Sequence, residues 1–279
     1  MKIKANAKIN FNLGICGKRQ DGYHLIDTVM HSVSLFDILQ INKAEKITVY
    51  CSNAEIDEKE NIAYKAAELF FEKTGVVGGA KIEIIKNIPT CAGLGGGSAD
   101  AAAVLCGLNT IYDAKLSEQQ LCEMALSLGA DVPFFIKGGC QRAQGIGEVL
   151  TSYKPLKDGY ILLAKADKKP STAQMYRLID QNEPVIVNTE KAIEYIEKND
   201  LKGLSKNLYN AFEAVWNKSS LKSKLYDFSP LAVALTGSGP TWFVLFDNLE
   251  SAEKLKLKLL KENIECYIVT PKSCALEFE

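Results

Sequence analysis

The chain has 279 residues, close to the length at which one hydrophobic core stops growing, so two domains are expected. Hydrophobic residues make up 47% and charged residues 24%, and the formal net charge is −1, which argues against a general nucleic-acid or anionic-membrane surface. Its apolar runs are too short to span a bilayer, and its first residues lack the apolar segment of a secretory signal. Eight cysteines without a C-x-x-C pair and only two histidines argue against a zinc site. We expect a cytoplasmic protein with reduced thiols and no zinc site.

The first predicted element is a strand over residues 3–13, where apolar and polar residues alternate with period two. Lys8 and Asn10 share its polar face. Most such faces are simply solvated, so a surface role for these two residues stands beside a functional one.

A turn is predicted at residues 19–22, directly before Tyr23 and His24. Loops use this kind of position for binding, although a histidine such as His24, taken alone, is more often an ordinary polar residue. Further strands are predicted at 29–38 and 46–51.

A glycine-rich stretch, residues 89–100, separates a predicted strand at 81–86 from a predicted helix at 99–108. Backbone N–H groups that converge at the positive end of a helix suit a phosphate, although a tight turn without a ligand is equally compatible with this pattern. No lysine follows the glycines, so the P-loop motif is absent. The dinucleotide fingerprint fits only in part, because Ser98 stands where its third small residue belongs.

Capping signals delimit two further helices. Asn61 is positioned to cap a helix that ends near Gly75. A capping box formed by Ser117 and Gln120 begins a second helix, which is predicted to end at Gly129.

Asp131 follows this helix directly and precedes the apolar segment 132–135. An acid in this setting is not expected to be fully solvated. A helix N-cap, with Pro133 in the first turn, is the plain alternative to a functional role. The segments 137–139 and 145–148 are typical of turns between short strands.

A change in composition over residues 152–158 marks a candidate domain boundary, which divides the chain into 1–155 and 156–279. Beyond it, Ser171 or Thr172 is positioned to cap a helix. The other elements predicted there are strands at 160–166, 231–235, 242–246 and 264–270, and helices at about 189–198, 207–217 and 250–262. Their alternation indicates an α/β sandwich with an antiparallel element.

Several of these segments, taken together, resemble the GHMP kinase superfamily. The glycine-rich stretch is similar to its phosphate loop, with glycines at two serine positions. The segments that carry the resemblance are Ala7–Asn10, Asp21–His24, Pro89–Ala99, Leu128–Pro133 and Thr236–Pro240. The resemblance implies an α+β, two-domain fold: an ATP-binding N-terminal domain like domain 2 of ribosomal protein S5, over 1–155, and a ferredoxin-like α/β sandwich over 156–279.

The resemblance also implies a catalytic pair and a phosphate cradle. Asp131 would accept a proton from the substrate hydroxyl, and Lys8 would lie beside it and stabilise the developing alkoxide. Ser98 would donate its hydroxyl to a phosphate or to Mg²⁺. The residues expected to hold ATP are Pro89, Thr90, Cys91, Ala92, Gly93, Leu94, Gly95, Gly96, Gly97, Ser98 and Ala99.

Within the superfamily the motifs are most similar to the branch that phosphorylates the 2-hydroxyl of a cytidine-diphosphate-linked methylerythritol in non-mevalonate isoprenoid synthesis. Tyr23 would stack on the base and His24 would read its edge. Tyr176 would offer a second stacking face, but it also fits the apolar stripe of its helix. The residues expected at this substrate are Asn10, Tyr23, His24, Thr172, Tyr176, Gly237, Ser238 and Gly239. The last three equally form a plain β-turn.

Other functions stay open. The chain could be another GHMP kinase for a small molecule, or a nucleotide-binding sensor that has lost catalysis. The presence of both Lys8 and Asp131 disfavours a sensor, and the incomplete glycine fingerprint disfavours a dehydrogenase. A homodimer is an open expectation.

Overall fold

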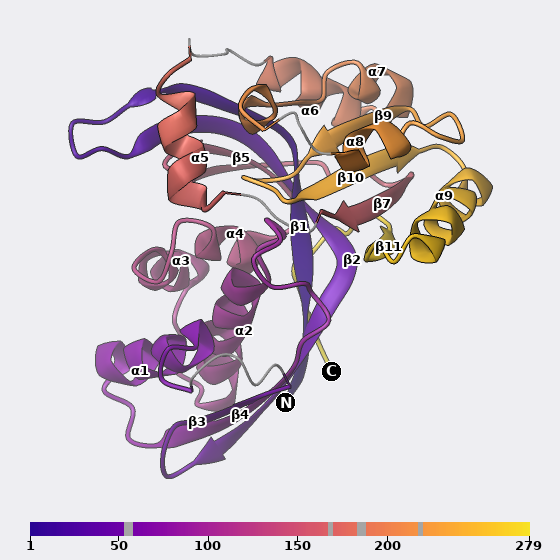
Figure 1. The fold of residues 1–279 in the computed structure, drawn as a ribbon. Helices are drawn as coiled ribbons and strands as arrows, with labels where there is room; N and C mark the ends of the chain where they lie inside the picture. Colours follow the sequence, from indigo (N-terminus) through magenta and orange to yellow (C-terminus); the bar gives the residue numbers. More distant parts are fainter. Residues whose placement is uncertain (53–57, 167–169, 183–187, 217–219) are drawn as a thin grey trace.

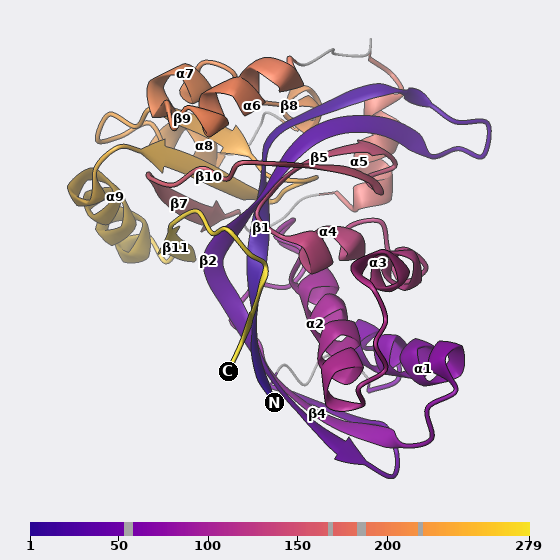
Figure 2. The same cartoon turned by 180° about the vertical axis from the view of Figure 1, so that it is seen from behind.

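Two long antiparallel strands run through most of the molecule. The computed structural model describes residues 1–52, 58–166, 170–182, 188–216 and 220–279. β1 (Lys2–Lys18) and β2 (His24–Ala44) pair over almost their whole length, and shifts in register at three places bend the ribbon they form. Figures 1 and 2 show this ribbon passing from the lower lobe of the molecule into the upper lobe.

β1 and β2 form the centre of an eight-stranded sheet within the described residues. The other strands are β3 (Thr48–Cys51), β4 (Gly79–Ile85), β5 (Cys140–Gly145), β6 (Val149–Tyr153), β8 (Tyr209–Asn210) and β12 (Leu276–Phe278). The main order is β12–β1–β2–β4–β3, while β5 pairs with β2 and β6, and β8 pairs with β1. Because β12 lies beside β1, the two ends of the chain are neighbours (Figure 1).

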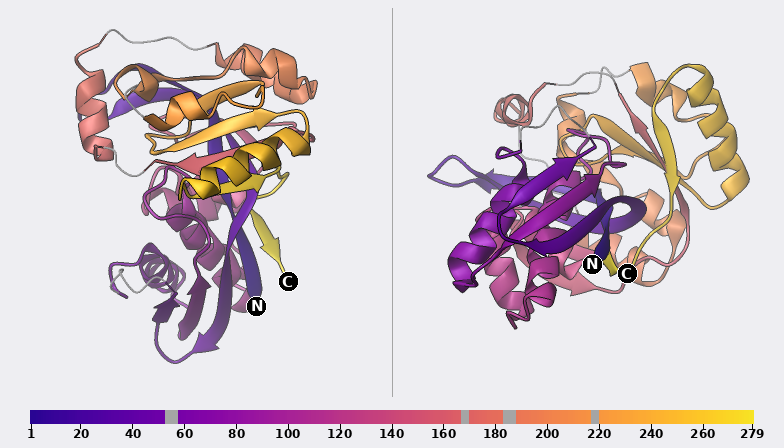
Figure 3. Two further views of the ribbon diagram at one scale, coloured as in Figure 1. Left: turned by 45° about the vertical axis from the view of Figure 1, so that its right-hand side comes forward. Right: turned by 90° about the horizontal axis from the view of Figure 1, so that it is seen from below.

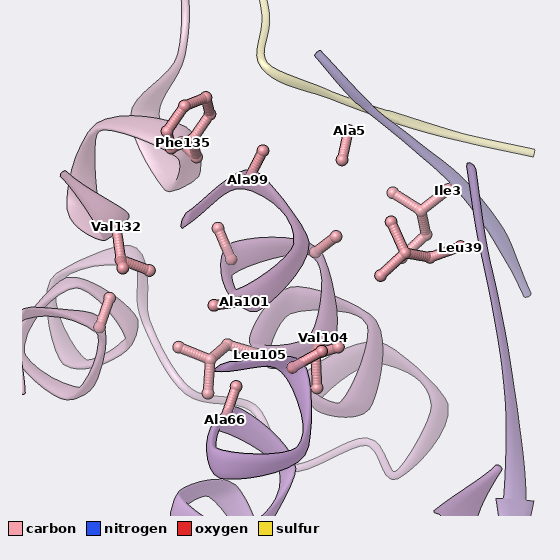
Figure 4. Packing of buried hydrophobic residues seen from close by; sticks show 14 of the residues in the cluster. Ile3, Ala5, Leu39, Ala66, Ala99, Ala101, Val104, Leu105, Val132 and Phe135 are labelled. Atoms are coloured by element: carbon pink, nitrogen blue, oxygen red, sulfur yellow. The ribbon is translucent and has the colours of Figure 1, made fainter. Parts of the chain in front are cut away.

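In the described part of this lobe, α1 (Ile62–Thr74) and α2 (Gly96–Ile111) pack on the sheet, while α3 (Glu118–Leu126) and α4 (Val132–Lys137) pack on each other and on α2. The central helix is α2, whose residues from Ala99 to Leu105 are fully buried, except that Asp100 is 3% exposed. Its small alanines let neighbouring elements approach closely, as Figure 4 shows for Ala66 on α1 and Val132 on α4. The glycine-rich stretch therefore ends on a rigid element.

A second, antiparallel sheet has the order β11–β7–β10–β9. Its strands are β7 (Tyr160–Lys165), β9 (Ala232–Leu235), β10 (Thr241–Phe246) and β11 (Cys266–Val269). The helices of this lobe are α5 (Thr172–Ile179), α6 (Thr189–Glu197), α7 (Leu201–Ser205), η1 (Ala211–Ala214), α8 (Ser220–Lys224) and α9 (Leu249–Lys261). Figure 3 shows this lobe beside the β1–β2 ribbon.

The helix starts predicted from capping signals are confirmed. The side chain of Asn61 accepts a hydrogen bond from the N–H of Ala63. Ser117 and Ser171 each form a complete capping box, with Gln120 and Gln174. These signals are reliable because both partners lie within one helical turn of each other.

Two features differ from the sequence-based expectation. The polar face of β1 is buried, not solvated, because elements of both lobes cover it, and Lys8 and Asn10 are only 4% and 2% exposed. The helix predicted at about 207–217 is wrong over residues 207–216, where the structure has β8 and η1, while residue 217 lies outside the described residues. Asn210 decides this, since its side-chain N–H₂ donates to the carbonyls of Leu235 and Gly237, which holds the segment against β9.

The imidazole of His31 on β2 ties this strand to the segment between the two lobes. Its Nδ1 lies 2.8 Å from the carbonyl oxygen of Ser32, and its Nε2 accepts from the N–H of Leu156 at 3.0 Å. Burial lowers the pKa of His31 to about 4. The ring is therefore neutral in the folded chain.

We expect this histidine to make stability fall as the pH drops below about 6.5. The unfolded chain binds a proton at His31 more readily than the folded chain does, so the folded state is weakened through this window. Between pH 6.5 and 5 the wild type should lose about 2 kcal/mol more unfolding free energy than His31→Gln, whose amide oxygen still accepts from Leu156. Urea titrations at the two pH values measure the difference, and parallel curves for both proteins would contradict it.

Candidate functional site

A pocket of about 1250 Å³ opens among β1, the glycine-rich stretch, the start of α4, α5 and the turn between β9 and β10. The predicted site residues that line it are Lys8, Asn10, Tyr23, His24, Thr90, Cys91, Gly93, Gly95, Asp131, Thr172, Tyr176, Gly237, Ser238 and Gly239. The remaining predicted residues, in the same stretch but outside the lining, are Pro89, Ala92, Leu94, Gly96, Gly97, Ser98 and Ala99. Residues from distant parts of the sequence thus converge on one cavity.

Lys8 and Asp131 form an ion pair at the wall of this pocket. The Nζ atom of Lys8 lies 3.4 Å from Oδ2 of Asp131. The lysine side chain is 5% exposed and the aspartate side chain is 37% exposed, so the carboxylate is the more accessible partner. Asp131 occupies the N-cap position of α4, yet its side chain makes no capping hydrogen bond. Its carboxylate is therefore available to a ligand, beside a buried positive charge.

Asn10 connects Lys8 to the second lobe. Its side-chain oxygen accepts from Nζ of Lys8 at 2.8 Å and from the N–H of Gly237 at 3.0 Å. Its side-chain nitrogen donates to the hydroxyl of Thr28 at 2.8 Å. Because both ends of the amide are engaged, Asn10 holds the ammonium group of Lys8 in place.

The glycine-rich stretch has the form of a cradle for an anion. Gly95, with φ +75°, is the N-cap of α2, and no side chain caps this helix. The first N–H groups of α2 therefore remain available at its positive end. The carbonyl of Leu94 accepts from the N–H of Lys8 at 3.0 Å, so the stretch is fixed to β1 at the backbone of Lys8. These donors fit the phosphates of a nucleotide.

Gly93 brings this stretch into contact with the turn at residues 236–240. It has φ +77°, and a Cβ atom there would lie 2.7 Å from the carbonyl oxygen of Thr236. Gly237 faces it in return, since its own Cβ would lie 3.1 Å from the carbonyl oxygen of Gly93. The glycines here permit two backbones to touch, which joins the two lobes at the pocket.

We expect Gly93→Ala to lower the free energy of unfolding by about 2 kcal/mol or more, because it combines a left-handed backbone with a steric clash. The matched control is Gly97→Ala in the first turn of α2, where the nearest contact of a Cβ would be 3.5 Å, to Ile62. That control should cost nothing, because alanine favours a helix more than glycine does. Urea unfolding measures the stability of both variants. Equal losses of unfolding free energy would show that the backbone contact at Gly93 has no energetic role.

Tyr23, His24 and Tyr176 lie at the other end of the pocket. Tyr23 is 60% exposed, so its ring is accessible to a ligand. His24 stacks on Tyr176 with ring centroids 4.6 Å apart, and Tyr176 also meets Phe212 edge-on. Burial, assisted by the charge of Asp131, raises the pKa of the Tyr176 hydroxyl to about 12. Tyr176 thus combines packing with a place on the pocket wall.

Several pocket residues were not predicted from the sequence. Among the predicted residues, the hydroxyl oxygens of Thr172 and Ser238 lie 2.9 Å apart, which connects α5 to the turn at residues 236–240. The unpredicted cations of the lining are Lys18, Lys165 and Arg177. Lys18 pairs with Asp180, whereas the charges of Lys165 and Arg177 suit an anionic ligand. All three lie in segments whose sequence has no distinguishing pattern.

A buried cluster of Lys86, Asp37 and Asp100 lies next to the glycine-rich stretch. Nζ of Lys86 lies 2.6 Å from the carboxylate of Asp100 on α2 and also contacts Asp37 on β2. Asp37 accepts from the N–H groups of Asn87 and Ile88, directly before the stretch. Burial raises the pKa of Asp100 to about 8, with Lys86 opposing this shift. Asp37 and Asp100 each lie within an apolar segment of the sequence. An acid in such a segment is the sequence signal that could have identified them as buried.

Within the described ranges, no group of three or more histidine, cysteine, aspartate or glutamate side chains is arranged to hold a metal ion. No helix there is both long enough and apolar enough to cross a bilayer.

Comparison with known proteins agrees with this geometry. The chain matches the N-terminal domain of GHMP kinases over residues 61–139 and the C-terminal domain of GHMP kinases over 192–265. A solved structure titled 4-(cytidine 5'-diphospho)-2C-methyl-D-erythritol kinase superimposes with a TM-score of 0.81 at 29% identity, covering 97% of this chain and 99% of that one. A homoserine kinase from Cytophaga hutchinsonii shares the fold, with a TM-score of 0.76 at 19% identity, covering 99% and 96%. The fold and the site define a GHMP kinase.

Curated relatives narrow the family further. A 4-diphosphocytidyl-2-C-methyl-D-erythritol kinase of Clostridium tetani is 42% identical over 276 residues, which is 96% of this chain and 99% of that protein. One of Clostridioides difficile is 39% identical over 287 residues, covering 99% and 97%. The chain belongs to the family of 4-diphosphocytidyl-2-C-methyl-D-erythritol kinases. The predicted family, two-domain α+β fold class and small-molecule kinase activity are confirmed.

Proposed function

We propose that this chain transfers a phosphoryl group from ATP to the 2-hydroxyl of 4-diphosphocytidyl-2-C-methyl-D-erythritol, in non-mevalonate isoprenoid synthesis. The names of its relatives supply the substrate. The observation that carries the chemistry is the ion pair of Lys8 and Asp131 on the wall of a pocket that also contains an uncapped helix N-terminus. Phosphoryl transfer needs positioning and neutralised charge more than covalent help from the protein.

Asp131 is the proposed general base. Its exposed carboxylate accepts the proton of the substrate hydroxyl, and Lys8 stabilises the negative charge that develops on that oxygen. Asn10 holds the ammonium group of Lys8 from the other side.

The stretch Pro89–Ala99 is the proposed triphosphate cradle. ATP supplies the phosphoryl group when bound, and Mg²⁺ neutralises its phosphates. The N–H groups of the first turn of α2 would hold those phosphates, and the hydroxyl of Ser98 would contact a phosphate or the Mg²⁺ ion. The buried triad of Lys86, Asp37 and Asp100 keeps this turn in place.

The cytidine end of the substrate is proposed to bind at Tyr23, His24 and Tyr176. Tyr23 offers an exposed aromatic face, and the pocket cations Lys165 and Arg177 suit the diphosphate. Thr172 and the turn Gly237–Gly239 would border the methylerythritol, between the base and the catalytic pair.

Release of ADP tests this proposal. The chain is incubated with Mg-ATP and, separately, with the cytidylyl substrate, mevalonate or homoserine, with a no-acceptor blank. We expect ADP release only with the cytidylyl substrate. Turnover of one of the other alcohols would favour another GHMP kinase, and nucleotide binding without turnover of any acceptor would favour a sensor.

We further propose two domains, 1–155 and 156–279, with one matched GHMP segment in each and with β8 and β12 returning to the first sheet. The exposed free thiols Cys16 and Cys91 suit a reducing compartment such as the cytoplasm. A homodimer stays a prediction, which sedimentation would test.

A further inference from the structure

Asp180 at the end of α5 makes a contact that the proposed chemistry does not use. One carboxylate oxygen lies 2.6 Å from Nε2 of His24, and the other lies 2.5 Å from Nζ of Lys18. Lys18 and His24 face each other across β1 and β2, next to the turn that joins these strands. Figures 1 and 2 show α5 beside that end of the ribbon. The contact therefore joins the second lobe to the base-binding end of the pocket.

This contact determines which nitrogen of His24 carries the proton. An ionised carboxylate only accepts hydrogen bonds, so Nε2 must be the donor. The hydrogen bonds from Lys18 and His24 lower the pKa of Asp180, which keeps the carboxylate ionised at neutral pH. Lys18 also balances the negative charge of Asp180, so the hydrogen bond from His24 to Asp180 does not need a positively charged imidazole. In a neutral ring with a proton on Nε2, Nδ1 is an acceptor.

The ring of His24 is held in one orientation. It stacks on Tyr176 with an interplanar angle of 22°, and its side chain is only 8% exposed. In the described part of the chain, Nδ1 has no hydrogen-bond partner. It is thus the nitrogen left for a ligand in the pocket that His24 lines.

An acceptor at this position distinguishes two pyrimidines. Cytosine carries an exocyclic amine, which donates, whereas uracil carries a carbonyl at the same place, which only accepts. A carbonyl opposite Nδ1 would leave both lone pairs unpaired in a partly buried site, and such mismatches weaken binding strongly.

We propose that Asp180 is a positioning residue that fixes His24 as the Nε2–H tautomer, and that this tautomer selects cytidine over uridine nucleotides. The inference rests on the proposed function for the identity of the base, but the tautomer itself does not depend on it.

The first test is the protonation state, measured by proton–nitrogen correlation NMR of the two imidazoles at neutral pH. The chain has only His24 and His31, so assignment needs one variant. His31 is an internal reference, because its Nδ1 donates to a carbonyl and its Nε2 accepts. We expect opposite tautomers for the two rings. In Asp180→Asn the spectrum of His24 should shift towards a mixture, while that of His31 stays unchanged.

The second test compares binding of CDP and UDP by calorimetry. The wild type should prefer CDP by at least about tenfold, and Asp180→Asn should lose most of that preference. Asp180→Glu should restore part of it. The KM for ATP should stay within about twofold of wild type. The matched control is Asp158→Asn, an exposed carboxylate that pairs with Asn199 away from the pocket, which should keep the full preference.

A proton on Nδ1 of His24 in the wild type would overturn the inference, as would an unchanged CDP preference in Asp180→Asn. Equal binding of CDP and UDP by a wild type that turns over the cytidylyl substrate would reject the selection alone. A wild type with the expected tautomer and CDP preference but no ADP release would refute the proposed kinase and leave this inference standing.

Discussion

Replacing Asp131 with asparagine is expected to slow turnover by about 10²–10⁴-fold, the usual contribution of a general base. Asparagine keeps the size of the side chain but does not accept a proton at neutral pH. The KM values for ATP and for the cytidylyl substrate should change little, because the carboxylate acts on the reacting hydroxyl and not on the bound groups. Steady-state ADP release at saturating substrate measures the effect on kcat.

Two comparisons make this result specific to the chemistry. Lys8→Met should also slow turnover, because it removes the charge beside the reacting oxygen. Asp113→Asn changes a highly exposed carboxylate outside the pocket lining and should leave kcat at the wild-type value. An Asp131→Asn protein with near wild-type kcat would mean that the base is another group.

Lys86→Met is expected to lower the free energy of unfolding by about 3–5 kcal/mol, the cost of leaving a buried charge without its partner. Lys86 is 9% exposed at its side chain, and it separates the carboxylates of Asp37 and Asp100, which are 0% and 5% exposed. Without the ammonium group the buried acids have no counter-charge, and at a pH at which both are ionised they repel each other. The pKa of Asp100 is already raised, so the loss should be greater at pH 8.5 than at pH 6.

Lys81→Met provides the matched control on β4, the strand that ends directly before Lys86. Lys81 pairs with Glu83 at 3.0 Å, but both side chains are nearly half exposed. Exposed pairs contribute at most about 1 kcal/mol, so this variant should unfold close to the wild type. Urea titrations of both variants at the two pH values decide the matter. Equal stability of Lys86→Met and Lys81→Met would show that the triad does not anchor the glycine-rich stretch.

The candidate site was predictable where its residues lie in short motifs. The stretch Pro89–Ala99 and the pair Lys8 and Asp131 are recognisable from neighbouring residues and from their order along the chain. The burial of Lys8 was not predictable, since β1 alone has an ordinary alternating pattern. Arg177 lies on α5 and Asp180 is its C-cap residue, and the polar residues of this short amphipathic helix show no spacing that points to a site.

The sequence by itself determined the local structure: the capped starts of α1, α3 and α5 and the glycine-rich start of α2. Each depends on groups only a few residues apart, so the chain encodes it without reference to distant segments. Only the tertiary structure decided that Lys8 is buried against Asp131, that Asp180 holds His24, and that Lys86 joins two acids. These contacts join residues far apart in the sequence, and their strength comes from burial, which exists only once the lobes have assembled.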